Sequence, residues 1–96
     1  MAVLSETDRK EKLDKLNGWQ FQNNQIEKEY SLKDFKSALN FVNKLGEEAE
    51  KMDHHPDINI HSYNKVKISL STHSEGGVTG KDFNLAEKIE NLNKSY

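Results

Sequence analysis

The stretch Glu50-Lys51-Met52-Asp53-His54-His55-Pro56 decides how the rest of the chain is organised. It closes the longest amphipathic segment and sets two adjacent histidines beside a proline. We expect this proline to end a helix, because the residue before a proline avoids helical angles. His73 and Asp82 follow later in the chain. We interpret these four residues as the lining of one pocket: His54, His55, His73 and Asp82.

A long helix is predicted before this stretch. Apolar residues recur from Leu32 to Met52 at the three- and four-residue spacing of one helical face. Ser31 and Asp34 resemble a capping box at its start. At 1.5 Å per residue this helix would be about 30 Å long. Gly46 lies within it at a cost of about 1 kcal/mol relative to alanine, and nothing in the sequence explains this glycine.

A strand pair is predicted on the N-terminal side of the long helix. Residues 19–22 and 25–30 alternate apolar and polar side chains, the period of a half-buried strand. Asn23-Asn24 between them suits a tight turn, because asparagine tolerates positive φ. Together the two segments predict a hairpin.

A second strand pair is predicted after the proline. Residues 58–62 and 64–72 alternate in the same way, and the second of them is the clearest strand in the chain. Val66 and Leu70 lie on its apolar side. His73 therefore falls on the opposite side, where it would be offered to solvent or to a ligand.

Two further helices complete the order. The first is expected from Ser5 to about Asn17, with Gly18 as its stop, and the last opens at a capping box formed by Thr79 and Asp82. The order α-β-β-α-β-β-α, in one domain over residues 1–96, predicts an α+β two-layer sandwich. Helices would cover one face of a four-stranded antiparallel sheet. A second copy could pair with its exposed edges, so a homo-oligomer, either dimer or tetramer, is expected.

The composition excludes several classes of function. The 96 residues contain no cysteine, which excludes disulfides, thiolate catalysis and zinc-thiolate sites. A net charge of -2 argues against direct nucleic-acid binding. No apolar run approaches the roughly 20 residues that span a bilayer, and the start does not resemble a signal peptide, so no membrane association and a cytoplasmic location are expected. Phosphate-binding glycine loops and a nucleophile elbow are absent from the sequence.

The adjacent histidines allow two interpretations. They can cap free carbonyls at a helix end, where the helix dipole favours a positive charge. Alternatively, several imidazoles in one cleft suit general acid-base catalysis near neutral pH. Glu50 favours the second interpretation, because it lies one helical turn before His54 and is expected to orient that imidazole.

A metal site is not expected. Adjacent residues on a helix point about 100° apart, and no histidine pair has the spacing that places two ligands on one helical face. His61 is expected to be a surface residue of its strand.

Two of the candidate residues have structural roles that would suffice to explain them. Asp82 can serve the capping box with Thr79 alone or contact the pocket as well. Trp19 is the kind of large ring that usually belongs to a core. Both roles stay open for both residues.

Beyond these patterns, the sequence resembles a known family. Glu50, the His54-His55-Pro56 run, Tyr63, His73 and Asp82 have the spacing of the pterin-4a-carbinolamine dehydratase signature. Blocks such as 49–56, 70–73 and 82–86 agree as well, and the resemblance covers roughly residues 17–92. It implies a small α+β fold and the loss of water from 4a-hydroxytetrahydropterin to give quinonoid dihydropterin. That reaction recycles the cofactor of aromatic amino acid hydroxylases, so the pterin is the substrate and no cofactor is implied.

The resemblance also implies a set of site residues. His54, His55 and His73 match the active-site histidines, with His55 as the principal acid-base group. The other two would be a second proton carrier and an orienting group, in an order left open. The positions implied to bind or orient the substrate are Glu50, Asp53, Pro56, Ser71, Thr72, Ser74, Asp82 and Trp19.

The resemblance has departures and alternatives. Many relatives carry a tryptophan near Ile58 and are one residue shorter before Tyr63, so the pocket wall can differ here. Some animal members bind a homeodomain transcription factor through their helical surface. This implies, as an alternative, a dimerisation cofactor or coactivator-type protein-binding module, which would also be nuclear. A third reading is a pterin-binding protein acting elsewhere, for example in molybdenum cofactor supply; only substrate preference would separate it from the dehydratase.

Overall fold

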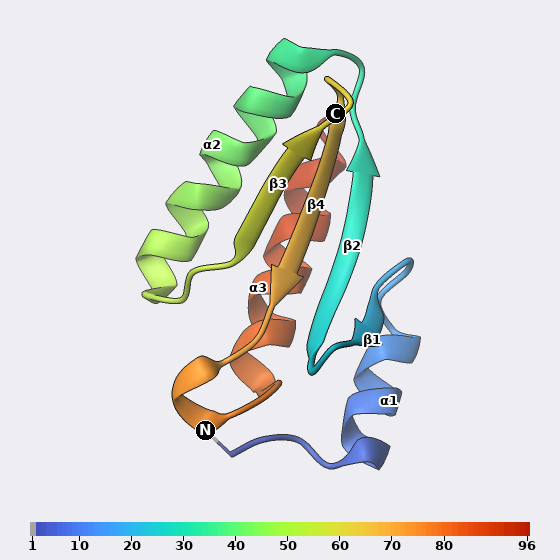
Figure 1. The fold of residues 1–96 in the computed structure, drawn as a ribbon, viewed down its shortest axis with the longest axis vertical. Helices are drawn as coiled ribbons and strands as arrows, with labels where there is room; N and C mark the ends of the chain where they lie inside the picture. Colours follow the sequence, from blue (N-terminus) through green and yellow to red (C-terminus); the bar gives the residue numbers. More distant parts are fainter. Residues whose placement is uncertain (1) are drawn as a thin grey trace.

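The structure, a computed structural model, describes residues 2–96 and has the predicted order α-β-β-α-β-β-α (Figure 1). Its elements are α1 (Glu6–Asp14), β1 (Gln20–Gln22), β2 (Gln25–Ser31), α2 (Phe35–Met52), β3 (Asp57–His61), β4 (Lys65–Leu70), the 3₁₀ turn η1 (His73–Glu75) and α3 (Gly80–Asn93). Among these residues, no helix combines the length and apolar character that crossing a bilayer requires.

The four strands form one antiparallel sheet with the order β1-β2-β4-β3. The central pair, β2 and β4, places Ile26 opposite Leu70 and Tyr30 opposite Val66. Helices α2 and α3 cover one face of this sheet, while α1 lies beside β1 (Figure 1). The predicted two-layer α+β sandwich is therefore confirmed.

The core fills the space between the sheet and the two covering helices. Alternate residues of β4 are fully buried there, as period-2 patterning requires. The ring of Phe41 on α2 meets Tyr30 edge-on, with 5.1 Å between ring centroids. Each fully buried Leu, Ile or Phe contributes about 1.5–3 kcal/mol. Buried side chains of this layer include Ile26, Ala38, Phe41, Leu45, Ala49, Val66, Ile68, Leu70, Phe83, Leu85, Ala86 and Ile89.

The predicted start of the long helix is wrong. Ser31 is the last residue of β2 and pairs with Lys65, so the sheet holds it in an extended conformation. The N-cap is Asp34, whose side chain accepts a hydrogen bond from the backbone N–H of Ser37 at 2.8 Å. Asp34 is thus a cap itself and not the third residue of a capping box.

The predicted end of this helix is also different. The helix ends at Met52 because Asp53 adopts the left-handed conformation, with φ 49°. The N–H of His54 then donates to the carbonyl of Ala49 at 3.1 Å, which closes a Schellman-type cap. Pro56 follows three residues later, directly before β3, and is not the stop.

Helix α1 is shorter than predicted and buries no residue, as expected from its weak apolar pattern. It ends at Asp14 rather than near Asn17, and Gly18 lies in the following turn with φ 83°. Arg9 holds the helix against β1 by stacking 3.6 Å above the ring centroid of Phe21.

Strand β4 ends two residues earlier than predicted. After Leu70 the chain forms a tight loop, which Thr72 and Gly77 close with an isolated antiparallel bridge. His73 lies in η1 within this loop, so a 3₁₀ turn and not a strand presents its side chain.

Candidate active site

His54 forms a buried pair with Asp82. Its Nε2 lies 2.5 Å from Oδ1 of Asp82, and the two residues are 8% and 0% exposed. The left-handed Asp53 turns the chain at the end of α2, and His54 meets Asp82 in the first turn of α3. A buried carboxylate on one ring nitrogen fixes the orientation and the tautomer of an imidazole.

Thr72 and Thr79 support the other oxygen of this carboxylate. Oδ2 of Asp82 accepts from the hydroxyl of Thr72 and from the backbone N–H of Thr79, both at 2.9 Å. The two threonine hydroxyls lie 2.8 Å apart. Because the single O–H of Thr72 is directed at Asp82, the hydroxyl of Thr79 donates to that of Thr72. Asp82 therefore serves the capping box and contacts a candidate catalytic histidine at once, so both roles left open for it hold.

The hydroxyl of Thr79 is a supporting group that the sequence reading assigned only to helix capping. The signal was available, because a threonine that opens a capping box three residues before a candidate carboxylate must lie beside it. Its link to Thr72 depends on the loop between them and could not be read from spacing.

His55 forms an exposed pair with Glu50. Its Nε2 contacts Oε2 of Glu50. The expectation that Glu50 would orient His54 is wrong: the helix ends before His54, so its side chain no longer follows the one-turn spacing. The hydrogen bond from His55 to Glu50 raises the pKa of the His55 imidazole, opposed in part by desolvation, while the negative charges of Glu50 and Asp53 add to the rise.

His73 is exposed on η1, next to the buried Thr72. The bond from Thr72 to Asp82 and that from Asp82 to His54 therefore connect the loop of His73 to the histidine pair. Ser74 is exposed beside it. The hydroxyl of Ser71 is engaged within the protein, where it donates to the backbone carbonyl of Asn24 at 3.1 Å.

The remaining predicted residues divide between the site and the core. Asp53 is exposed and Pro56 half-buried, and both adjoin the histidine pair in the chain. Trp19 is 5% exposed within the core, and its indole N–H donates to Oε1 of Glu90 at 3.0 Å. Glu90 lies eight residues beyond Asp82 on α3, about 12 Å further along at 1.5 Å per residue. Trp19 therefore contacts the C-terminal half of α3, whereas His54 contacts its first turn.

Glu90 is the centre of a second polar cluster, which the sequence reading missed. Its Oε1 accepts from Trp19, from Nζ of Lys28 at 2.5 Å and from the hydroxyl of Tyr30. Burial alone would raise the pKa of Glu90, but the hydrogen bonds from Lys28, Tyr30 and Trp19 hold it below the ordinary value. The available signal was Lys28, which lies between Ile26 and Tyr30 on the same face of the strand as these two core residues and so needs a carboxylate partner.

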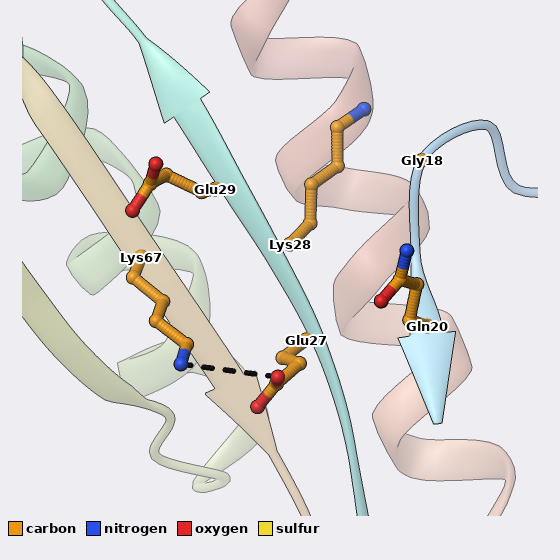
Figure 2. Close-up of a pocket in the computed structure, with 6 residues that line it drawn as sticks. All are labelled: Gly18, Gln20, Glu27, Lys28, Glu29 and Lys67. Carbon is orange, nitrogen blue, oxygen red and sulfur yellow. Dashed lines mark ion pairs between the residues drawn. The ribbon is translucent and has the colours of Figure 1, made fainter. Parts of the chain in front are cut away.

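Two hollows on the open face of the sheet are lined by residues other than the histidines. One of about 310 Å³ lies over β1, β2 and β4 (Figure 2). In that view Glu27 and Lys67 approach each other, at 3.8 Å, while Lys28 extends toward α3. Glu29, also at this hollow, is paired with His61 at 2.5 Å. The residues lining the hollow are Gly18, Gln20, Glu27, Lys28, Glu29 and Lys67.

The candidate active site is thus the surface where the end of α2, the loop of η1 and the start of α3 meet. It offers one buried imidazole, His54, that a carboxylate orients, and two exposed ones: His55, the next residue in the chain, and His73, on the loop whose Thr72 binds the same carboxylate. Such a set can donate and accept protons near neutral pH. In the described part of the chain no three His, Asp or Glu side chains converge as metal ligands would; that no metal takes part stays a prediction.

Known proteins resemble this chain over nearly all of its length. The family model described as pterin 4 alpha carbinolamine dehydratase matches residues 2–92. A protein of Sulfolobus acidocaldarius, whose name gives it provisionally as a pterin-4-alpha-carbinolamine dehydratase, is 46% identical and aligns over 93% of this chain and 97% of its own. A protein of Sulfurisphaera tokodaii with the same provisional name is 47% identical over 96% of this chain and 98% of its own.

Solved structures agree with these relatives. A transcriptional coactivator/pterin dehydratase from Brucella melitensis superposes with a TM-score of 0.88 at 38% identity, over 94% of this chain and 97% of its own. A pterin dehydratase-like protein described as a RuBisCO assembly factor in the alpha-carboxysome gives a TM-score of 0.62 at 20% identity, over 77% of this chain and 84% of its own, and shares the fold. The sequence match and the fold agree, and the chain belongs to the pterin 4 alpha carbinolamine dehydratase family.

Proposed function

We propose that this protein removes water from 4a-hydroxytetrahydrobiopterin to give quinonoid dihydropterin by histidine general acid-base catalysis. It would thereby recycle, in the cytoplasm, the pterin cofactor of aromatic amino acid hydroxylases. The observation that carries the proposal is that two histidine–carboxylate pairs occur side by side in the chain, at positions that match the family's signature. The His54–Asp82 pair is buried and the His55–Glu50 pair is exposed. No cofactor is needed, because the pterin is the substrate.

The proposed reaction needs two proton movements. The C4a–O bond breaks and the hydroxyl group leaves as water, so an acid must give that oxygen a proton. A ring nitrogen of the pterin then loses a proton to a base, and the double bond of the quinonoid product forms. Positioned acid-base groups typically accelerate such steps by about 10²–10⁴-fold.

His55 is the group best suited to protonate the leaving oxygen. It is exposed to a substrate, and its hydrogen bond to Glu50 raises the pKa of its imidazole, so more of it carries a proton near neutral pH. His73, exposed on the neighbouring loop, would be the second proton carrier. His54 would be the orienting group, because its Nε2 is held by Asp82, the carboxylate that also binds Thr72 at the base of the His73 loop.

The experiment is stopped-flow absorbance of 4a-hydroxytetrahydropterin, made in situ by a phenylalanine hydroxylase. The wild-type protein should accelerate formation of the quinonoid product, and His55→Ala should lose about 100-fold or more of that acceleration. His61→Ala is the matched control, because His61 also pairs with a glutamate but lies on β3, in the sheet. A folded wild-type protein without acceleration would refute the function, and unchanged turnover in His55→Ala would refute the role of His55.

Self-association is proposed with this function. Phe35 and Leu39 on the outer side of α2 are 50% and 39% exposed, and a methyl group added at Gly46 would meet nothing within 4 Å. This stripe suits a second copy packed antiparallel, which would set Lys36 of one helix near Glu47 of the other. Light scattering that gives the mass of one chain would contradict it.

The coactivator-type alternative is not favoured, because no observation on the described residues supports it over the dehydratase.

A further inference from the structure

The loop that carries His73 is held from outside by the turn between β1 and β2. Asn24 in that turn makes two of the contacts. Its side-chain N–H donates to the carbonyl of Gly76 at 2.9 Å, and its own carbonyl accepts from the hydroxyl of Ser71 at 3.1 Å. The two bonds hold the loop on either side of η1.

The packing around these bonds is tight. A Cβ at the buried Gly77 would come within 3.2 Å of Oδ1 of Asn24 and 3.3 Å of a methyl group of Val3. The N–H of Leu4 donates to the carbonyl of Val78 at 2.9 Å, beside the same loop. A second segment of the chain therefore supports the place where Asn24 meets the loop.

On the inner side, the loop is held at its base. Thr72 exchanges backbone hydrogen bonds with Gly77 at 2.9 and 3.3 Å and binds Asp82 through its hydroxyl. The base is thus fixed by the buried polar group, whereas the tip, residues 73–76, is exposed. At the tip, the side chain of Asn24 makes a long-range hydrogen bond to the carbonyl of Gly76.

We propose that Asn24 is a positioning residue that fixes the direction of the His73 imidazole, an inference that rests on the proposed function of His73. The position makes two demands. Its φ of 59° requires a residue that tolerates the left-handed region, and the carbonyl of Gly76 requires a side-chain donor. Asparagine meets both; glycine and aspartate at this position keep the turn but supply no N–H.

The test compares Asn24→Gly and Asn24→Asp with the matched control Asn23→Gly. Asn23 has φ 56° in the same turn, and within residues 2–96 its side chain makes no hydrogen bond that would be lost. The first readout, independent of activity, is NMR: the ring signals of His73 and amide exchange at Gly76 and Gly77. Both Asn24 variants should shift or broaden the His73 signals. They should also speed exchange about fivefold, the factor expected for one hydrogen bond.

The second readout is pterin turnover. Both Asn24 variants should lower kcat about fivefold with a smaller change in KM, while the melting temperature stays within a few degrees of wild type. Asn23→Gly should match wild type in all of these. If His73 signals and loop exchange in Asn24→Gly equal those of wild type, the inference is overturned. An equal loss of turnover in Asn23→Gly and Asn24→Gly overturns it too, because the effect would then come from the turn and not from the side chain.

The failure of the inference is distinct from that of the proposed function. An inactive wild-type protein would refute the dehydratase, whereas altered His73 signals in the Asn24 variants alone would still support the positioning contact. An active wild-type protein with undisturbed His73 signals in both Asn24 variants would leave the dehydratase in place and refute the contact.

Discussion

Helix α3 carries two carboxylates that gather polar partners, Asp82 in its first turn and Glu90 in its third. Asp82 is fully buried and binds His54, Thr72 and the N–H of Thr79. Glu90 is partly buried, and its Oε1 accepts from Trp19, Lys28 and Tyr30. Each group joins α3 to chain segments far away in the sequence.

The two groups differ in what their partners can do. The partners of Glu90 are an ammonium, a phenol and an indole. Burial, and to a lesser extent the hydrogen bond to Glu90, raises the pKa of the Tyr30 phenol above its ordinary value. The partner of Asp82 is an imidazole, the side chain that proteins most often use for proton transfer near neutral pH, and the next residue, His55, is exposed. A carboxylate with several hydrogen-bond donors thus does not by itself indicate a catalytic site. A histidine partner that is followed in the chain by an exposed histidine does.

The largest effect is expected at the first carboxylate. Asp82→Ala would leave the buried His54 imidazole and the N–H of Thr79 without their acceptor, which should lower the free energy of unfolding by about 3 kcal/mol. Turnover per folded molecule should fall about 100-fold or more. Urea unfolding and turnover at the same temperature measure both.

Asp82→Asn is the companion variant if the alanine protein does not fold. It keeps an oxygen for Thr79 but loses the charge that holds His54. The free energy of unfolding should therefore fall less than in Asp82→Ala, while turnover per folded molecule should still fall strongly. Wild-type turnover per folded molecule in this variant would contradict the assignment of a catalytic role to the polar group around Asp82.

A smaller effect, of a different kind, is expected at the second carboxylate. Glu90→Gln keeps one acceptor oxygen but leaves the charge of the partly buried Lys28 without its counter-charge. The free energy of unfolding should fall by about 2 kcal/mol, as for a lost charged hydrogen bond, while turnover per folded molecule stays the same. A loss of turnover at unchanged stability would show that this cluster takes part in the chemistry.

The smallest effect on the fold is expected at Glu50. The imidazole of His55 has its pKa raised in the folded protein, so the contact favours folding below the ordinary pKa of histidine, and that contribution disappears as the pH rises through the raised value. Glu50→Gln should lower the pKa of His55, and the loss of turnover at higher pH should begin at a lower pH. NMR titration measures this, with His61 as an internal reference that should not move. An unchanged titration of His55 would contradict the assignment.

The sequence was most informative where local pattern and tertiary structure agree. The alternation of β4 and the capping box of Thr79 and Asp82 each depend on neighbours within a few residues, and both appear in the structure as predicted. The apolar face of α2 appears only in part, because Ala38, Leu45 and Ala49 are buried whereas Phe35 and Leu39 are exposed. The resemblance to the family signature implied His54, His55 and His73 as active-site residues, and these roles stay predictions.

The errors arose where a long-range contact or one unusual residue overrides a local pattern. Ser31 resembled a cap but is held by pairing with β4. Glu50 was assigned to His54 because a helix was assumed to continue, whereas Asp53 ends it with a left-handed residue. The cluster around Glu90 joins residues 60 to 71 positions apart, a separation that no spacing rule covers.

The bond between Leu4 and Val78 has a practical consequence for protein engineering. It brings the start of the described chain to the loop of His73, while the other end of the chain lies at the opposite pole of the molecule (Figure 1), where the ring of Tyr96 packs 5.5 Å from that of Phe41. An affinity tag or fluorescent label attached at the start of the described chain would lie beside the loop of His73 and would restrict access of a substrate to it. The same group attached after Tyr96 would leave this loop open, which makes the C-terminus the better place for immobilisation.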